Sequence, residues 1–422
     1  MIAAAPTALL AVAAGAAVII AIISCRAWPS AAFVAWVLVL FFVPVWVGVT
    51  VGAFWAAVTL MTLLMIAVNW SAVPLRVADL WIAAFVVVSV SLFALGSVTL
   101  SAMTIALLEW IVPYIWGRIV LARVGKRVIV RTIAIVAVVA AALTILEFAL
   151  HFNPFVLIPG SGEAYTTWRP LQQRGGVMRA EGAFGHSIAL GASLAMSTAF
   201  VVATRWRLAP MLLSVTVIGV ATVVTFSRAA LITLVVTLVL AVFFLPGVSA
   251  RIRAGFVAAA VVAFVSVSPL LDSVFGDAGS DLEVSGDYRS DLVVLLDQVR
   301  LIGNAGDWTT RVSGDDYLGY FARSVDNALL VLLLRFGWIP TGLLVAALLC
   351  AALTVVRRST RNPPGIAVVG QLPSLVVVAL ITQYGMFLWF CVGLALSWGH
   401  RSDHEDDRAS VFTSEPERMV AR

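Results

Sequence analysis

Long apolar runs follow one another along almost the whole chain. They cover residues 7–24, 31–70, 77–95, 100–116, 129–150, 180–204, 208–226, 229–245, 254–271, 327–356 and 366–398. A helix needs about 20 apolar residues to cross a membrane, whereas the strands of a β-barrel give short alternating segments. The run at 31–70 fits one broken span or two short ones, and the run at 366–398 fits two short spans. The pattern predicts an all-α polytopic membrane protein with about 12 transmembrane helices, within a range of about 11–13.

One polar interval, residues 272–327, interrupts this pattern between the late apolar runs. Ten of the 22 acidic residues of the chain lie in its part from 272 to 316: Asp272, Asp277, Asp281, Glu283, Asp287, Asp291, Asp297, Asp307, Asp315 and Asp316. Loops that are positioned by a rigid scaffold often carry function. We therefore expect one large extracytoplasmic loop, at about 272–323, with the chemistry of the protein at or near it.

The composition agrees with a membrane protein and excludes several other classes. The chain of 422 residues is 62% hydrophobic and 12% charged, with a mean hydropathy of +1.05, whereas a soluble domain has about 25% charged residues. The net charge of +5 comes from short basic clusters at the ends of apolar runs, so we expect no nucleic-acid partner. The three cysteines are scattered and form neither a disulfide framework nor a metal site. We expect no metal and no cofactor.

Basic clusters set the predicted topology. They lie at residues 118–131, 205–207, 251–253 and 357–361, and cytoplasmic loops carry an excess of Lys and Arg. The outer loops are then 151–178, the turn at Ser227 and Arg228, and 272–323. The first run lacks a basic flank and is expected to be a span rather than a cleaved signal peptide. We expect one transmembrane domain at 1–399, both termini in the cytoplasm, and a polar, disordered cytoplasmic tail at 400–422.

Three arginines on the predicted outer face call for an explanation, because orientation selects against basic residues there. They are Arg179, Arg228 and Arg289. Each has an alternative without function: Arg179 in an ion pair with Glu181, Arg228 as a helix-end anchor that extends to the interface, and Arg289 as a solvated loop charge. Taken together they favour an anion site, because the guanidinium group suits bidentate binding of phosphate.

Other polar residues flank the same predicted face. His186 lies a few residues after Arg179 and is either a core histidine or a substrate ligand. Asp326 and Asn327 begin a long apolar run, so Asp326 is either a helix N-cap or a general base. The amphipathic run at 290–303 predicts a helix lying on the membrane surface.

These motifs, taken in order, resemble a known family. They are Arg179 with residues 181–186 (Glu-Gly-Ala-Phe-Gly-His), residues 225–230 (Thr-Phe-Ser-Arg-Ala-Ala), Arg289, Gly303, Gly306, residues 324–327 (Ser-Val-Asp-Asn) and Gly337. Over residues 118–398 the chain resembles the O-antigen ligase and polysaccharide polymerase family of the bacterial cell envelope. The resemblance implies a metal-independent, inverting glycosyltransferase in the cytoplasmic (inner) membrane, with its active site on the extracytoplasmic face.

The resemblance also implies roles for the residues. Arg228 and Arg289 would hold the pyrophosphate of a polyprenyl-pyrophosphate-linked glycan, and Asp326 would be the base; these three form the predicted catalytic set. The predicted substrate-binding set is Arg179, Glu181, His186 and Asn327. Expected partners are the lipid-linked glycan, membrane lipid, a flippase and a chain-length regulator.

Several functions remain open at this stage. Many ligases of the family have a histidine where this chain has Asp326, and this departure favours a polymerase of cell-surface polysaccharide over a ligase. A transporter of a lipid-linked or amphiphilic substrate is another alternative, although the halves of the chain show no internal repeat. A membrane scaffold without catalysis is the third.

Overall fold

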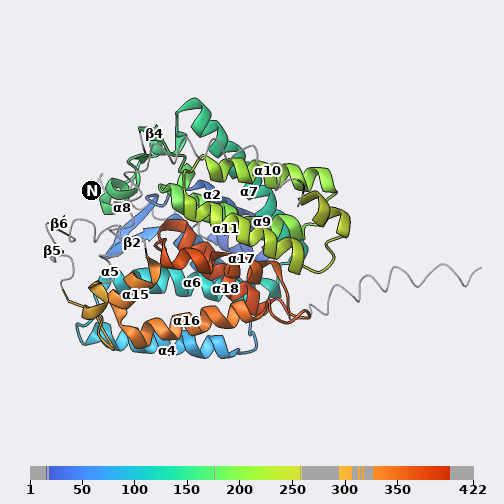
Figure 1. Ribbon diagram of the computed structural model, residues 1–422. Coiled ribbons are helices and arrows are strands. Elements are labelled where there is room, and N and C mark those ends of the chain that lie inside the picture. The colour runs from blue at the N-terminus through green and yellow to red at the C-terminus, as the bar shows by residue number, and fades with distance from the viewer. Residues whose placement is uncertain are drawn as a thin grey trace, which may run out of the picture.

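The computed structural model describes residue 16 and residues 19–174, 176–256, 258, 294–306, 312–313, 316–317 and 327–399. Most of these residues are helical, and the long helices run roughly along one common direction (Figure 1). The all-α prediction is therefore confirmed for the described part of the chain. The tail at 400–422, which we expect to be disordered, lies outside the described residues, as does most of the acidic interval.

The α-helices of the described residues fall into an early and a late group. The early group is Ile19–Ala27, α2 (Pro29–Phe42), α3 (Ala57–Asn69), α4 (Val77–Ala94), α5 (Leu100–Ile105), α6 (Val112–Ile119) and α7 (Lys126–Leu150). The late group is α8 (Gly162–Trp168), α9 (Ser187–Ala203), α10 (Leu208–Val223), α11 (Arg228–Phe244), α15 (Ala328–Phe336), α16 (Trp338–Leu353), α17 (Pro363–Gln371) and α18 (Thr382–Ser397).

Short elements connect these helices. A π-helix, η1 (Ala106–Ile111), joins α5 to α6. The 3-10 helices are η2 (Val120–Ala122), η3 (Pro154–Leu157), η4 (Gly182–Phe184), η5 (Val294–Gln298) and η8 (Leu372–Val376). Three antiparallel two-stranded hairpins pair β1 (Gly48–Val51) with β2 (Ala53–Ala56), β3 (Gln173–Arg174) with β4 (Val177–Met178), and β5 (Val312–Ser313) with β6 (Asp316–Tyr317).

The expected number of about 12 spans is not supported. Among the described residues, three helices are long and apolar enough to cross a membrane: Val77–Ala94, Leu100–Ala122 and Lys126–Leu150. A bent pair, Ile19–Ala27 with Pro29–Phe42, would be a fourth. Six further apolar helices have only 10–17 residues. At 1.5 Å per residue, a helix of 16 residues extends about 24 Å, which is less than the hydrocarbon core of about 30 Å.

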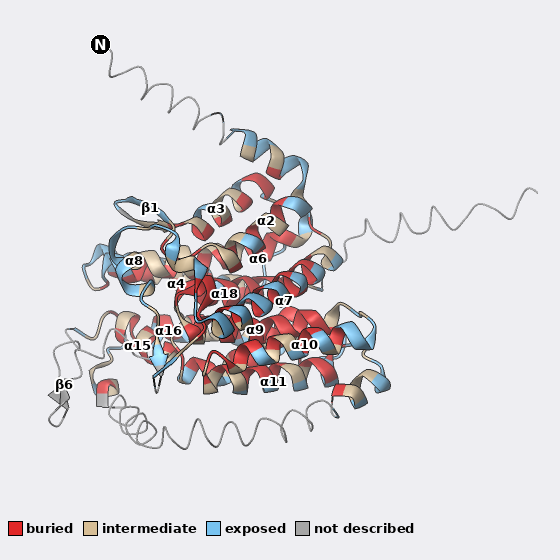
Figure 2. Cartoon of the chain, turned by 90° about the horizontal axis from the view of Figure 1, so that it is seen from above, coloured by how far each residue is buried: buried red, intermediate tan, exposed pale blue. Residues whose placement is uncertain are grey.

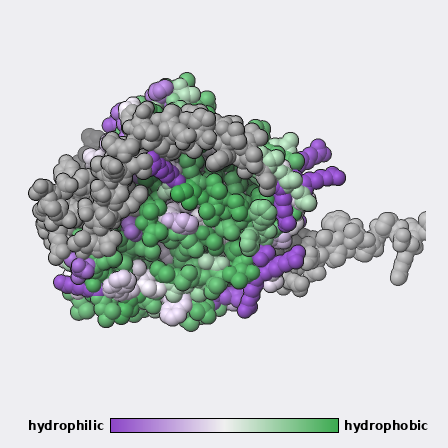
Figure 3. Space-filling view, in the orientation of Figure 1, coloured by the Kyte–Doolittle hydropathy of each residue, from purple (hydrophilic) through white to green (hydrophobic). Residues whose placement is uncertain are grey.

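Apolar side chains nevertheless dominate the outside of the molecule. In the space-filling view they occupy the broad middle of one face, and hydrophilic side chains gather toward its edges (Figure 3). Many large hydrophobic side chains of the spanning helices are exposed, for example Leu80, Val87, Ile135 and Leu146. This distribution suits a surface that faces lipid.

Two predicted runs are broken in the structure. In the run at 31–70, α2 ends at Phe42 and the β1–β2 hairpin precedes α3, so the run holds two helices, of which α3 is too short to count as a span. The run at 327–356, which was expected to be one span, breaks at Gly337, where φ is +89°. The backbone N–H of Gly303 donates to Phe336 O at 2.8 Å, and that of Trp338 donates to Arg300 O at 3.1 Å. Residues 300–303 therefore supply the hydrogen bonds at the break.

The amphipathic run at 290–303 differs from its prediction too. Its described part, from residue 294, contains the short helix η5 instead of a long surface helix. Leu295 is buried against Leu330 and Leu334 of α15. The apolar side of this segment thus packs on protein rather than lying on the membrane surface.

The centre of the molecule is formed by α9 and α18, whose residues are almost all buried (Figure 2). Glycines allow close packing of α18 on α6. A Cβ at Gly117 would clash with the backbone carbonyl of Phe390, and a Cβ at Gly393 would clash with that of Tyr114. Small residues let helix backbones approach in this way, so the two helices are held backbone to backbone.

A buried ion pair joins three helices at one end of the molecule. Arg118 was predicted to belong to a cytoplasmic basic cluster, but its side chain is only 4% exposed. Its Nε and Nη2 donate to the carboxylate of Asp79 at 2.8 Å each, Nη2 also donates to Pro74 O at 2.7 Å, and Nη1 donates to Ser397 Oγ. The start of α4 and the ends of α6 and α18 therefore share one end, which we call the basic end because Lys126, at the start of α7, and other basic residues lie there.

We expect Arg118→Ala to destabilise the protein by about 3–5 kcal/mol, because it leaves the Asp79 carboxylate in apolar surroundings without its cation. Reversible unfolding of the purified protein in detergent micelles measures this change. Arg123→Ala, at an exposed position nearby, is the matched control and should change stability by less than about 1 kcal/mol. Equal effects of the two substitutions would contradict the structural role of the pair.

Candidate functional site

The candidate site lies at the opposite end of the molecule from the basic end. Glu147 is in the last turn of α7, and the rise of the helix places it about 32 Å from Lys126. The loop before α9 carries Arg179, Glu181 and His186, and α11 begins with Arg228. We call this end the outer end, after the face on which the sequence predicts these arginines to lie, and we call Glu147, Arg179, Glu181, His186 and Arg228 the outer-end cluster.

The carboxylate of Glu147 organises this loop. Its Oε1 accepts hydrogen bonds from Asn153 Nδ2 at 2.9 Å and from the backbone N–H of Glu181 at 3.0 Å, and its Oε2 accepts from the backbone N–H of Gly182 at 2.9 Å. Asn153 Nδ2 also donates to Gly182 O at 3.1 Å. Glu147 is buried, and these donors replace the water that its charge would otherwise require.

Glu181, whose backbone N–H donates to Glu147, is itself fully buried. Its Oε1 accepts from the backbone N–H of Gln172 at 2.7 Å, whereas its Oε2 has no hydrogen-bond partner among the described residues. Burial is the main reason why the pKa of Glu181 is raised to about 7. The N–H of Gln172 lowers this pKa, the charge of Glu147 raises it further, and the charge of Arg179 lowers it. A buried carboxyl with such a pKa can take up or release a proton near neutral pH.

Arg179 ties the loop to the turn that precedes α11. Its Nε donates to Thr225 O at 2.9 Å, and the backbone N–H of Ala180 donates to Val224 O at 3.3 Å. Two arginines from separate segments are thereby held at one end of the molecule, because Arg228 follows Thr225 in the same turn. The charge of Arg179 also acts on Glu181 and on His186.

The turn before α11 explains why Ser227 and Arg228 interrupt an apolar run. Phe226 has a positive φ of 49°, which reverses the chain after α10. Ser227 is the N-cap of α11, and its Oγ accepts from the N–H of Ala230 at 3.2 Å. Arg228 is half-buried at the first position of the helix, so it lies at a helix end rather than in the middle of a span.

His186 has a structural task in the described geometry. It is the N-cap of α9, and its Nδ1 accepts from the N–H of Ile188 at 3.2 Å. The ring makes an edge contact with Trp168 at 6.0 Å between centroids. Burial, and then the charge of Arg179, lower the pKa of His186 to about 3. The ring is therefore neutral near pH 7, with its proton on Nε2.

Asn327, another predicted site residue, caps a different helix. Asn327 is the N-cap of α15, where its Oδ1 accepts from the N–H of Leu330 at 3.0 Å. The next residue, Ala328, donates its N–H to Val378 O at 3.1 Å, so Asn327 lies near the segment before α18. Arg289 and Asp326 lie outside the described residues, and their predicted roles stay predictions.

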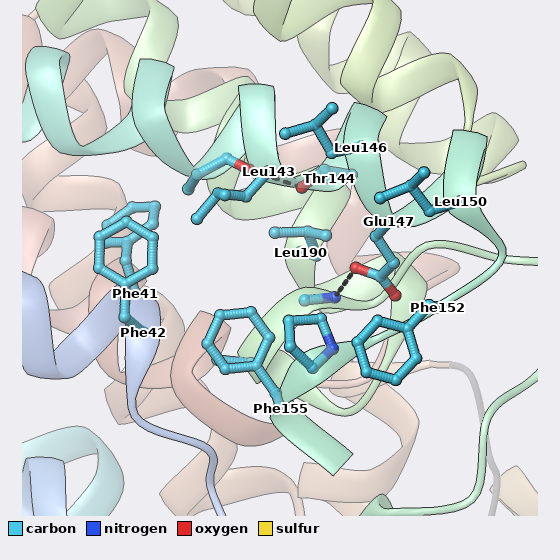
Figure 4. A pocket seen from close by; sticks show the side chains of 14 residues that line it. Phe41, Phe42, Leu143, Thr144, Leu146, Glu147, Leu150, Phe152, Phe155 and Leu190 are labelled. Carbon is cyan, nitrogen blue, oxygen red and sulfur yellow. Dashed lines mark hydrogen bonds between the residues drawn. The ribbon is translucent and has the colours of Figure 1, made fainter. Parts of the chain in front are cut away.

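An apolar cavity of about 270 Å³ adjoins the cluster (Figure 4). It lies between the ends of α2 and α7 and is lined by Phe41, Phe42, Ala140, Leu143, Thr144, Leu146, Glu147, Leu150, Phe152, Pro154, Phe155, Gly182, Ala183 and Leu190. Its walls are almost wholly hydrocarbon, and the Glu147 carboxylate lies at one side with its oxygens toward the backbone of the loop. Such a cavity suits a hydrocarbon chain rather than a polar ligand.

Sequence reasoning missed several polar residues of the interior. Glu147 and Asn153 hold the outer-end loop in place. Glu109 of the π-helix interacts electrostatically with Arg335 of α15. The available signal was a single acid within an apolar run, since an ionisable residue in a membrane segment is usually functional or paired. In the part of the chain that the structure describes, His, Cys, Asp and Glu side chains form no group that would hold a metal ion.

A search of family models and of curated proteins found no match to this chain.

The pKa of Glu181 predicts how stability depends on pH. The folded carboxyl titrates near 7 and the unfolded one near its ordinary 4.5, so the folded state binds more protons between these values. The contribution of Glu181 to stability is then fully present below about pH 4.5 and is lost as the pH rises through about 7. We expect the wild-type unfolding midpoint, relative to that of Glu181→Gln, to fall across this range.

The other titrating groups are the same in the wild type and in Glu181→Gln, so their contributions to the pH dependence cancel in the difference between the two midpoints. His186 acts in the opposite sense, because its lowered pKa makes stability fall as the pH drops below about 6.5. Glu163→Gln changes an exposed acid of the same outer region and should keep the wild-type dependence. Parallel curves for the wild type and Glu181→Gln would show that this carboxyl has no raised pKa.

Proposed function

We propose that the chain is a membrane-embedded glycosyltransferase that acts on a polyprenyl-pyrophosphate-linked glycan. It works on the extracytoplasmic face of the bacterial cytoplasmic membrane and transfers the glycan to a sugar hydroxyl, so that repeat units of a cell-surface polysaccharide are polymerised. The observation that carries the proposal is the bond from Arg179 Nε to Thr225 O at 2.9 Å. It holds a guanidinium group from one loop at the turn that carries Arg228.

The reaction that we propose needs charge stabilisation more than covalent chemistry. The acceptor hydroxyl attacks the anomeric carbon, the bond from that carbon to the pyrophosphate oxygen breaks, and the configuration inverts. The pyrophosphate leaves with the electron pair, and preorganised cations stabilise its growing charge. Arg179 and Arg228 fill this role, together with Arg289, and Asp326 takes the proton of the hydroxyl.

The surroundings of the cluster support a donor that is part lipid and part anion. The N-terminus of α11 lies at Arg228, and helix N-termini favour negative charge. The apolar cavity beside Glu147 offers space for hydrocarbon next to the loop that carries Arg179. A phosphate headgroup and a prenyl chain would need this combination of cationic and apolar surfaces.

A transporter of the same lipid-linked substrate is the second candidate. Transporters use broken helices, and this chain has a pair bent by 116° at residues 27–29 and a break at Gly337. The two candidates differ in where the donor collects when the protein fails. A missing transferase leaves the lipid-linked glycan on the outer leaflet, whereas a missing transporter leaves it on the inner leaflet.

We expect Arg228→Ala and Arg179→Ala to lower the transfer rate by about 100-fold or more, the loss typical of removing one stabilising donor. Long surface glycan should disappear from gels of the host bacterium while the lipid-linked unit accumulates on its outer leaflet. Arg228→Lys keeps the charge but not the bidentate geometry and should be intermediate.

The protein level of each variant must equal that of the wild type, as judged by immunoblotting. Arg358→Ala is the matched control, because it removes an exposed arginine from the basic end; its glycan pattern should be normal. Normal glycan in both Arg179→Ala and Arg228→Ala would refute the transferase proposal. Accumulation of donor on the inner leaflet would favour the transporter.

A further inference from the structure

A second and larger cavity lies at the basic end, far from the outer-end cluster. Its volume is about 740 Å³. It forms where the start of α7, the α9–α10 turn, the segment after α11, the start of α17 and the residue after α18 meet. It is lined by Lys126, Arg127, Val130, Arg131, Val202, Ala203, Thr204, Arg205, Trp206, Leu245, Pro246, Gly247, Val248, Ile252, Arg361, Pro363 and Trp398.

The lining of this cavity is strongly positive. Five of its residues are cationic: Lys126, Arg127, Arg131, Arg205 and Arg361. None of the lining residues that the structure describes is an aspartate or a glutamate. Like charges from three separate segments repel one another around a shared space, and an anion inside that space would remove the repulsion.

Several of these cations are held in position by their neighbours. Arg361 donates from Nε to Val355 O at 3.0 Å, and its guanidinium lies 4.7 Å from the ring centre of Phe244. Lys126 Nζ lies 5.8 Å from the ring centre of Trp398. A Cβ at Gly247 would stand 3.1 Å from Arg205 Nη2, so the absence of a side chain there leaves room for that guanidinium.

The backbone adds to the same potential. The first two turns of α7, a helix of 25 residues, contribute Lys126, Arg127 and Arg131, and the first residue of α17, Pro363, also lines the cavity. Helix N-termini carry partial positive charge. Two helix ends and five cationic side chains therefore face one space.

We propose that this cavity binds the phosphate headgroup of an anionic membrane lipid. Basic cavities between transmembrane helices bind such headgroups, and tryptophan gathers at headgroup level; Trp206 and Trp398 both line the cavity. The site does not depend on the proposed transferase activity, since it uses none of the residues of the outer-end cluster. It is a binding site for a lipid that the protein does not consume.

Native mass spectrometry of the purified protein tests the proposal. The protein is equilibrated in mixed micelles with phosphatidylglycerol or with phosphatidylcholine, and the lipid that stays bound is counted. The wild type should retain phosphatidylglycerol preferentially. In the double variant Arg131→Gln with Arg205→Gln this retention should fall by about tenfold or more, because two of the five cations of the lining are removed and charge-assisted hydrogen bonds to phosphate are strong.

The matched control is the double variant Arg357→Gln with Arg358→Gln. It removes the same charge from exposed positions at the same end, outside the lining of the cavity, and should keep wild-type retention. Equal losses in the two double variants, or equal retention of the two lipids by the wild type, would overturn the proposal. Gel filtration checks that both variants stay folded.

A further arm separates a lipid headgroup from a free anion. Inorganic phosphate is added at millimolar concentration to the protein loaded with phosphatidylglycerol. Retention of the lipid should persist, because its acyl chains remain in the micelle and hold the headgroup at the cavity. Complete displacement by inorganic phosphate would identify a soluble anion as the ligand and overturn the lipid assignment.

Discussion

The carboxylate of Glu147 is the interaction on which the outer end of the molecule depends. It lies in the last turn of α7, where it accepts two backbone N–H groups from the loop in front of α9 and the side-chain amide of Asn153, which follows α7. If the backbone of that loop moved away from the helix, the buried carboxylate would lose its hydrogen-bond donors, which costs free energy. The position of Arg179, and through its bond to Thr225 the position of the turn before Arg228, follows from this anchor.

The two ends of the molecule differ in the charged side chains that they hold and in how these side chains are paired. At the outer end, the carboxyl groups of Glu147 and Glu181 are buried and accept backbone hydrogen bonds, and Arg179 is tied to the turn before Arg228. At the basic end, cations line an open cavity without acids among the described lining residues, apart from the buried pair of Arg118 and Asp79 close by. The first arrangement suits a site that handles protons and one anionic group. The second suits attraction to an anionic surface.

The sequence predicted the helical architecture and most helix positions, because apolar periodicity and chain length decide them. Of the three arginines that the sequence suggests for an anion site, Arg179 and Arg228 lie on segments joined by the hydrogen bond from Arg179 Nε to Thr225 O, and their role stays a prediction. The sequence did not predict the break at Gly337, which depends on hydrogen bonds from residues 300–303. It placed Arg118 among the surface cations, because pairing with Asp79, 39 residues earlier, leaves no trace in local patterning. Glu147 did carry a local signal, a single acid within an apolar run, but its hydrogen-bond partners lie in the loop that follows and are not visible in the pattern.

The close packing of α18 on α6 has a structural consequence. Helix α18 begins beside Gln383, whose Nε2 donates to Val43 O at 2.9 Å and to Ala183 O at 3.3 Å at the outer end. It ends beside Trp398, which lines the basic cavity. Gly117 and Gly393 bring the backbones of α6 and α18 into direct contact between these two ends. A single helix, packed backbone to backbone on its neighbour, therefore contributes contacts both to the outer loop and to the basic cavity.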